Sequence, residues 1–391
     1  MKIIDVSTIL LSHRKTHPPM QRAYALVRVE TDAGLVGWGE ASSNYGHSYP
    51  TIIKAIVKDV VSRNLRGKDA RDIRRRVQEM HVLLDGYLGW DGVSAQVIGA
   101  IEIALWDILG KEAGLPISRL LGATAGSIPV YGTGTTMFEA THDWYACYFD
   151  DALKHGFKGV KVRLSTDPTA SLERVARVRE HVGPDLLLMV DAYWAYPPDE
   201  ALALARQLEP LDIFFFEEPS PQFQLAGLRR LCGRSPIPIA VGERVYSPSQ
   251  FQLIAELGAA HVFEPDASIC GGISACMDIA AIARAHDLMI VPHVGSPTAV
   301  GLAANLHWAA AAGCPLIEYD IYPELPMRDE LLQDPILSMD RIENGMIKVP
   351  DGPGLGIELN ESAFERFPYV SGETYAEVFP DHEAGRLRQI S

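Results

Sequence analysis

The chain is poor in cysteine, has no long apolar run and lacks an excess of basic residues. Its five cysteines among 391 residues, an odd number without Cys-x-x-Cys spacing, indicate free thiols in a reducing compartment. Lys and Arg number 35 against 50 Asp and Glu, and the net charge of −15 argues against nucleic acid or an anionic membrane as a partner. No stretch approaches about 18 consecutive apolar residues, so we expect no membrane-spanning helix.

The first residues also lack the apolar core of a secretion signal, because Asp5 interrupts the segment MKIIDVSTILLSHRK. Together with the free thiols, this predicts a cytoplasmic protein. The remaining composition, 47% apolar and 22% charged with 33 glycines, excludes disordered, collagenous and coiled-coil chains. A length of 391 residues predicts two domains, or one large barrel with an addition.

The N-terminal third has the pattern of a small α+β unit. Alternating apolar residues predict antiparallel strands over 3–11, 24–31 and 35–39. Helical periodicity follows over 49–63, 69–84 and 93–113, where Gly114 and Pro116 end the last helix. Residues 12–22 and 42–48, rich in Pro, Gly, His and Asn, are expected to be loops.

From residue 128 onward, short apolar runs alternate with helical stretches. The runs are IPVYGTG, KGVKVR, LLLMVDA, DIFFFEE, IPIAVGE, HVFEPD, LMIVPH and PLIEYD. Eight such units in about 200 residues predict a closed barrel of parallel strands covered by helices. The sequence after about residue 326 loses this rhythm, and we expect it to return to the N-terminal unit.

Polar residues stand at the ends of six consecutive runs. They are Asp191, Glu217, Glu243, Asp266, His293 and Glu318. Their successive spacings of 26, 26, 23, 27 and 25 residues each correspond to one strand and one helix. Because the carboxyl ends of barrel strands surround one mouth, we expect these side chains to gather over a single site.

Three of these residues are acids that would repel one another in a water-poor cleft. Asp191, Glu217 and Glu243 therefore need protons or a cation for neutralisation. An all-oxygen ligand set suits Mg²⁺, and no His-x-His pair in the barrel indicates a zinc hydrolase. Glu218 follows Glu217 and alternates to the opposite face, so we expect it to pack outside the site.

The other polar residues have the chemistry of proton transfer and charge stabilisation. Asp266 can accept a hydrogen bond from His293, which orients the imidazole and makes its other nitrogen a better base. Lys161 and Arg163 lie two residues apart on one strand and share a face, so both are expected in the mouth. Glu318 is expected to be protonated and to donate to developing negative charge, with a buried structural role as the alternative.

With these residues in place, the chain resembles the enolase superfamily and, within it, the mandelate racemase-like subgroup. The resemblance covers nearly the whole chain through WGEA, IALWDILGK, KVR, VDA, EEP, VGE, PDASICGG, PHV and LIEYD. It implies an α/β fold with a modified (β/α)7β TIM-type barrel at 126–326. It also implies an α+β capping domain at 1–125, to which a C-terminal segment at 327–391 returns.

The same resemblance implies Mg²⁺ as the cofactor and abstraction of the proton α to a carboxylate. Its metal ligands correspond to Asp191, Glu217 and Glu243, and its base dyad to Asp266 and His293. Glu318 corresponds to its hydrogen-bond donor. A homo-oligomer is a further expectation from the resemblance.

One departure from the subgroup affects the reaction. The subgroup usually has Lys-x-Lys on the second barrel strand, whereas this chain has Lys161-Val162-Arg163. Arginine stays protonated up to pH ~12, so Arg163 is suited to holding substrate and not to removing a proton. A single base, His293, serves a dehydratase, whereas a racemase needs a base on each face of the substrate.

The sequence therefore predicts a Mg²⁺-dependent hydro-lyase that converts a sugar acid to a 2-keto-3-deoxy acid. Two alternatives remain: a racemase, epimerase or sugar-lactone cycloisomerase that uses the same enediolate, and a catalytically silent acid-sugar-binding barrel. Arg163, Tyr193, His17 and Tyr45 are the candidate substrate contacts, the last two on the expected loops. Lys161, Arg163 and Glu318 join the dyad as candidate catalytic residues.

Overall fold

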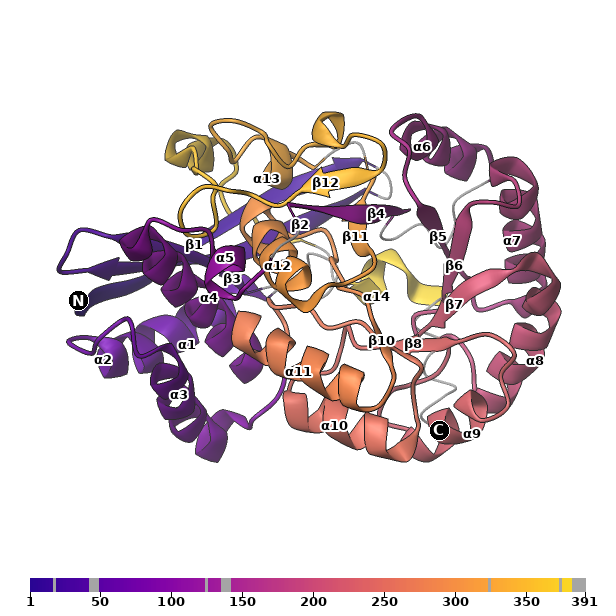
Figure 1. Cartoon of the computed structure of the whole chain (residues 1–391), viewed down its shortest axis with the longest axis horizontal. Helices are drawn as coiled ribbons and strands as arrows, with labels where there is room; N and C mark the ends of the chain where they lie inside the picture. The colour runs from indigo at the N-terminus through magenta and orange to yellow at the C-terminus, as the bar shows by residue number, and fades with distance from the viewer. Residues whose placement is uncertain are drawn as a thin grey trace.

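The chain forms an N-terminal unit of one sheet and several helices, followed by a larger barrel (Figure 1). The computed structural model describes residues 1–16, 19–41, 49–123, 126–134, 142–322, 325–372 and 375–381. The N-terminal sheet is antiparallel, in the order β1 (Ile3–Thr16), β2 (Pro19–Thr31) and β3 (Val36–Ala41). All three expected strands are therefore present.

The first hairpin is longer than the sequence predicted. Residues 12–16 and 19–22 were expected in a loop, but His13 pairs with Arg22 in the ladder of β1 and β2. The polar side chains of this segment find partners on the barrel: Lys15 lies 3.5 Å from the ring centre of Tyr322, and Arg22 lies 3.9 Å from Asp320. A strand can include charged residues when their side chains find partners. Here the partners are about 300 residues away, so the local sequence does not reveal them.

The N-terminal helices cover this sheet. They are α1 (Pro50–Ile56), a π-helical turn (Val57–Val61), α2 (Ser62–Leu65), α3 (Ile73–Leu88) and α4 (Val93–Ala113). Helix α4 packs so closely on β3 that a Cβ added at Gly39 would lie 1.7 Å from the Ala100 carbonyl oxygen. By length and hydropathy alone α4 could cross a membrane, but 83% of that window is buried inside the protein, as in the core helix of a globular domain.

Eight parallel strands form the barrel, as predicted. They are β4 (Ser127–Thr133), β5 (Gly159–Arg163), β6 (Leu187–Asp191), β7 (Ile213–Glu217), β8 (Ile239–Val241), β9 (Val262–Phe263), β10 (Met289–Ile290) and β11 (Ile317–Asp320). The strand order runs from β10 back to β4 and then to β11. A hydrogen bond of 3.4 Å from the Glu318 amide to the Pro292 carbonyl joins the two ends.

A helix follows each of the first seven barrel strands in the described part of the chain. These helices are α6 (His142–Lys154), α7 (Pro168–Val182), α8 (Pro198–Leu208), α9 (Leu225–Cys232), α10 (Pro248–Leu257), α11 (Ile273–Ala285) and α12 (Ala299–Ala312). This alternation confirms the (β/α)7β architecture. Shorter helices lie at α5 (Ile117–Leu120), α13 (Pro326–Asp329) and α14 (Tyr375–Val378).

Strand alternation explains why polar groups meet at one end of the barrel. Buried apolar residues fill its interior, and four of them are Met189, Phe215, Val291 and Leu316. Each lies two residues before a polar residue of the predicted site, so both side chains of each pair point inward. In the ladder, Arg163 pairs with Asp191 and Asp191 with Glu217, which brings the strand ends level.

The C-terminal segment contacts both units. Strand β12 (Met346–Lys348) pairs antiparallel with β4 of the barrel. Further along, Ser12 donates a hydrogen bond of 2.8 Å to the Pro368 carbonyl. In the N-terminal unit, Asp107 accepts from the Leu355 amide at 2.9 Å and from the Trp38 amide at 3.0 Å. The division of the chain at residues 125 and 326 stays a prediction.

Candidate active site

Three buried carboxylates meet at the mouth of the barrel. One oxygen from each of Asp191, Glu217 and Glu243 lies within 4.8 Å of the other two. Asp191 and Glu217 end β6 and β7, and Glu243 follows β8 after Gly242, where a Cβ would lie 2.5 Å from the backbone of Glu264. Glycine at that position therefore allows the strand ends to approach closely.

The electrostatics of the trio favour a bound cation. Burial and the neighbouring Asp191 carboxylate raise the pKa of Glu217 to about 8, against the opposing effect of Lys161. Glu217 Oε1 is buried and has no hydrogen-bond partner among the described residues. A dication would neutralise the trio and use that oxygen, and an all-oxygen set suits Mg²⁺. The residues present thus fit the ion.

The predicted dyad is also assembled. His293 Nδ1 lies 3.2 Å from Asp266 Oδ2, and its Nε2 lies 3.0 Å from Glu243 Oε2. Burial alone would lower the pKa of His293, but the hydrogen bonds with Asp266 and Glu243 and the charge of Glu318 raise it well above its usual range. Without a cation on Glu243, the imidazole is therefore held as a cation itself.

Asp266 is oriented by a residue that the sequence did not single out. Asn305 Nδ2 donates to Asp266 Oδ1 at 2.9 Å, and the Ser268 hydroxyl donates to the same oxygen at 2.7 Å. Asn305 Oδ1 in turn accepts from the Ala267 amide and from the Trp308 indole, which locks the amide's orientation. No local motif marks Asn305, because it lies inside the apolar helix α12.

Both cations of the second barrel strand reach the carboxylates, as expected. Lys161 bonds to Glu217, lies 2.7 Å from Glu318 Oε1 and 3.7 Å from Asp191 Oδ2. Burial alone would lower the pKa of Lys161, but these acids raise it well above its usual range, so the ammonium stays charged. Arg163 pairs with Asp191.

Glu318 was expected to be protonated beside a bound metal, and the groups that face it in the described structure act against that. Burial would raise its pKa, but the charges of Lys161 and His293 and a hydrogen bond from the Val294 amide at 2.7 Å lower it. With these partners Glu318 accepts hydrogen bonds, and its role as a donor stays a prediction for the metal-bound site. The sequence shows the burial of Glu318 but not the cations that face its carboxyl group.

The structure adds Arg244 to the mouth and gives Glu218 a different role. Glu218 is fully buried and pairs with Arg244, whose second nitrogen lies 2.6 Å from Glu243 Oε1. The guanidinium contacts two aromatic rings, 3.8 Å from the centre of Tyr193 and 4.4 Å from that of Trp194. The position of Arg244 next to a predicted ligand is the only sequence signal that marks it.

Glu264 is a second residue that the sequence analysis missed. It is buried, and neither of its carboxylate oxygens has a hydrogen-bond partner among the described residues. Burial and the charge of Glu217 raise its pKa well above the usual range, which favours the neutral acid. Glu264 lies two residues before Asp266, so the same alternation that placed Asp266 in the mouth could have identified it.

The candidate substrate contacts are only partly described. The Tyr193 amide donates to Asp191 Oδ1 at 2.9 Å, and its ring packs with Phe379 near the C-terminus. The backbone of Tyr193 is left-handed, with φ of 49°, which is uncommon for a residue with a side chain. His17 and Tyr45 lie outside the described residues, so their role stays a prediction.

This geometry defines a class of protein: a capped β/α barrel with an acidic trio and an Asp–His dyad at its mouth. Comparison of the sequence with known protein families supports the same class. Residues 146–363 match the model of the enolase C-terminal domain-like family, and residues 7–122 match the mandelate racemase / muconate lactonizing enzyme N-terminal domain. The chain belongs to the mandelate racemase and muconate lactonizing enzyme family of the enolase superfamily.

Individual relatives span nearly the whole chain. A D-galactarolactone cycloisomerase of Agrobacterium fabrum is 34% identical over 94% of this chain and 99% of its own. An arabinonate dehydratase of Saccharolobus solfataricus is 33% identical over 87% of this chain and 89% of its own. The crystal structure of the 3,6-anhydro-D-galactonate cycloisomerase from Zobellia galactanivorans superposes with a TM-score of 0.84 at 30% identity, over 95% of this chain and 100% of that one. The chain is an enzyme, of the lyase type that the dehydratases among its relatives represent.

Proposed function

We propose that the chain is a Mg²⁺-dependent dehydratase that converts a sugar acid to a 2-keto-3-deoxy acid. One observation favours this over racemisation: the mouth holds the base His293, while the second strand presents Arg163, which is paired with Asp191. Because arginine does not give up its proton at neutral pH, proton transfer is confined to one face of the substrate. The dehydratases among the relatives support the same class.

Asp191, Glu217 and Glu243 would hold the Mg²⁺ ion. The ion supplies Lewis acidity toward the substrate carboxylate and so acidifies the α-carbon. Lys161, charged and 2.7 Å from Glu318, lies where negative charge develops on the carboxylate oxygens and stabilises it electrostatically. Arg163 holds the carboxylate or a hydroxyl group.

His293 carries the proton. The bond between the α-carbon and its hydrogen breaks, the proton moves to Nε2, and the electron pair enters the substrate as an enediolate. The bond between the β-carbon and its hydroxyl then breaks, and the imidazolium returns the proton so that water leaves. The resulting enol converts to the 2-keto-3-deoxy acid. Asp266, fixed by Asn305 and Ser268, keeps Nδ1 protonated and directs Nε2 to the substrate.

Cycloisomerisation of a sugar lactone is the second candidate, because two of the relatives named above are cycloisomerases. It begins with the same proton abstraction but loses no water. A barrel that binds an acid sugar without turnover is the third. We further propose a cytoplasmic homo-oligomer with a small acid-sugar substrate and neither nucleic acid nor membrane as a partner.

The test is a screen of mono- and diacid sugars and their lactones with Mg²⁺ in D₂O. A keto acid that has lost one water relative to its substrate and carries deuterium at C3 supports dehydration. A rearranged acid with no net loss of water supports cycloisomerisation, and binding without either product supports the silent barrel. The His293→Asn variant should lose turnover, while His181→Asn, a partly exposed histidine of α7, should retain it; an active His293→Asn enzyme would contradict the assignment.

A further inference from the structure

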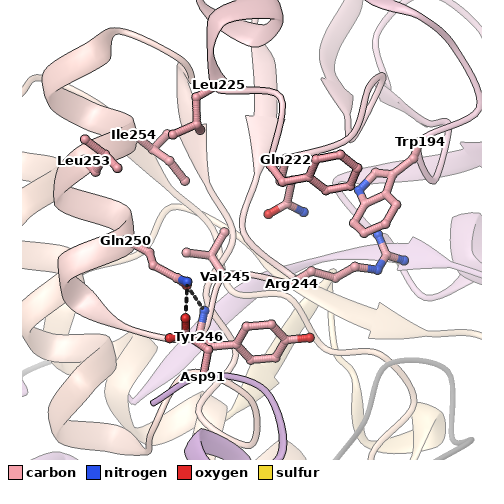
Figure 2. A pocket seen from close by; sticks show the side chains of 11 residues that line it. Asp91, Trp194, Gln222, Leu225, Arg244, Val245, Tyr246, Gln250, Leu253 and Ile254 are labelled. Carbon is pink, nitrogen blue, oxygen red and sulfur yellow. Dashed lines mark hydrogen bonds between the residues drawn. The ribbon is translucent and has the colours of Figure 1, made fainter. Parts of the chain in front are cut away.

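A cavity lined by Arg244, whose guanidinium contacts Glu243 of the barrel mouth, is drawn in Figure 2. It has a volume of about 390 Å³, which is within the usual size of small-molecule sites. Its walls come from the segments that follow β6, β7 and β8, from helix α10, and from Asp91 of the N-terminal unit. The three carboxylates, His293 and Lys161 do not line it.

An aromatic and cationic wall separates this cavity from the carboxylate trio. Arg244 is held by Glu218 and Glu243 and contacts the rings of Tyr193 and Trp194. Trp194 and Arg244 line the cavity, whereas Tyr193 does not. The backbones of Tyr193 and Trp194 are both left-handed, with φ of 49° and 64°. Such conformations are strained and concentrate at ligand sites.

One polar side chain in the cavity has an unmet hydrogen-bonding capacity. Gln222 is only 8% exposed, and neither its amide nitrogen nor its amide oxygen has a partner among the described residues. Its amide points into the space between Val245 and Arg244 (Figure 2). A buried amide without partners is costly and rare, so it marks a position where a further molecule supplies the bonds.

The neighbouring amide provides a contrast within the same cavity. Gln250 Oε1 accepts from the Tyr246 amide at 2.8 Å, and Gln250 Nε2 donates to Asp91 Oδ2 at 2.8 Å (Figure 2). Gln250 therefore ties the barrel to the N-terminal unit. Gln222 has no such structural function in the described part of the chain.

The lining also restricts the charge of the ligand. The nearby charged groups are three acids, Asp91, Glu218 and Glu243, and one cation, Arg244, which is already paired with two of them. An anion would meet this negative excess in a poorly solvated space. Apart from the amides of Gln222 and Gln250, the remaining walls are apolar or aromatic and include Leu225 and Phe223. The ligand is therefore neutral, with a hydrophobic face and a group that both donates and accepts.

We propose that this cavity binds a neutral polyhydroxylated ring, of the class of free sugars and sugar lactones, through a hydroxyl group bonded to the Gln222 amide. The ring's C–H face packs against the aromatic and apolar wall, where dispersion and burial stabilise it. The site is distinct from the barrel mouth and does not depend on the proposed function. A charged sugar acid is excluded from it.

The test uses the full chain with D-galactose and D-galactono-1,4-lactone as probes and D-galactonate as the charged counterpart. Crystals soaked with each probe should show a neutral ring in the cavity with a hydroxyl on Gln222, and no galactonate there. Titration calorimetry with EDTA and with Mg²⁺ should give the same affinity for the neutral probe, because the trio does not take part.

Two variants and one control complete the experiment. Gln222→Leu, nearly equal in size, should weaken binding about tenfold, since it removes a buried hydrogen bond. Leu253→Trp should fill the cavity from its rim, where Leu253 is 46% exposed, and abolish binding. Gln207→Leu on the exposed face of α8 should change nothing. A cavity that holds only water, a probe found only in the barrel mouth, or unchanged binding by Gln222→Leu would each overturn the proposal.

Discussion

The two halves of the barrel mouth are held together by different kinds of contact. The half that we call the carboxylate side comprises Lys161, Arg163, Asp191, Glu217, Glu243 and Arg244. There, buried ions contact buried ions of opposite charge. The half that we call the dyad side comprises Asp266, His293 and Glu318. Neutral donors, namely Asn305, Ser268 and the Val294 amide, bond to its two carboxylates, although Glu318 also lies 2.7 Å from Lys161 of the carboxylate side.

This difference indicates different sensitivities. A network of buried charges rearranges when a dication enters or when one charge is removed, because each ion depends on its partners. Asp266, whose Oδ1 is fixed by neutral side chains, should keep its orientation whether or not the dication is present. The dyad is thus prepared in advance, and the carboxylate side is completed by the metal.

The largest effect should come from one substitution on each side. We expect Glu217→Gln and His293→Asn each to reduce turnover by about a thousandfold or more, as loss of a metal ligand or of a general base does. Calorimetric titration with Mg²⁺ separates them, because Glu217→Gln should lose binding and His293→Asn should retain it. Equal metal affinity in the two variants would contradict the division of the mouth.

The next effect concerns stability on the carboxylate side. Arg244→Met should lower the free energy of unfolding by about 3 kcal/mol, because it leaves Glu218 as an unpaired buried charge. Adding Glu218→Gln should restore a large part of that loss, and urea unfolding of the single and double variants measures both. Simple additivity of the two changes would show that the pair is not coupled.

On the dyad side, Asn305→Ala should reduce kcat about 10- to 100-fold, as loss of a group that orients a catalytic residue does. KM and Mg²⁺ affinity should stay near their original values, because neither substrate nor metal touches Asn305. Asn305→Asp, which keeps an oxygen acceptor for Trp308 but loses the donor to Asp266, should behave similarly. A variant with normal kcat would remove Asn305 from the positioning of the dyad.

The smallest effect that we expect is a pH dependence of the free energy of unfolding. It arises from Glu40, which contacts the start of the helix that supports the dyad. Glu40 accepts hydrogen bonds from the Thr298 and Gly301 amides at the start of α12, the helix that carries Asn305. Burial raises the pKa of Glu40 from 4.5 to about 7, despite these bonds. The folded chain therefore keeps a proton that the unfolded chain has lost, and stability falls as pH rises.

From pH 6 to pH 8 this group alone should reduce the free energy of unfolding by about 1 kcal/mol. The Glu40→Gln variant cannot ionise at this position, so its free energy of unfolding should not show this decrease. Urea unfolding of both proteins at pH 6 and pH 8, with Mg²⁺ present, measures the difference. The same slope in both proteins would show that Glu40 is ionised throughout.

The barrel and the residues at its mouth could be predicted because both leave a periodic signal in the sequence. Apolar strands recur with their helices at a nearly constant interval, and each predicted site residue follows a strand. Asn305 and Arg244 leave no such signal, since their importance depends on a partner from another strand or helix. Glu264 does follow the alternation, two residues before Asp266, and was overlooked. The long hairpin was missed for the same reason: Lys15 and Arg22 find partners on another part of the chain, among them Tyr322 and Asp320.

Protonation states were the least predictable feature. The sequence places Glu318 after apolar residues, which suggests a neutral acid, but the charge of Lys161 reverses that conclusion. Burial and pairing act in opposite directions on the same carboxyl group. Their balance depends on distances between strands that no single segment contains.

Asp107 has a practical consequence for protein engineering. Its two oxygens join β3 through the Trp38 amide and the C-terminal segment through the Leu355 amide, and Lys111 lies 2.7 Å away on the same helix. Chimeras that take residues near 38, 107 and 355 from different parents break this junction at its centre. Recombination libraries should therefore inherit these three segments together and place their crossovers elsewhere.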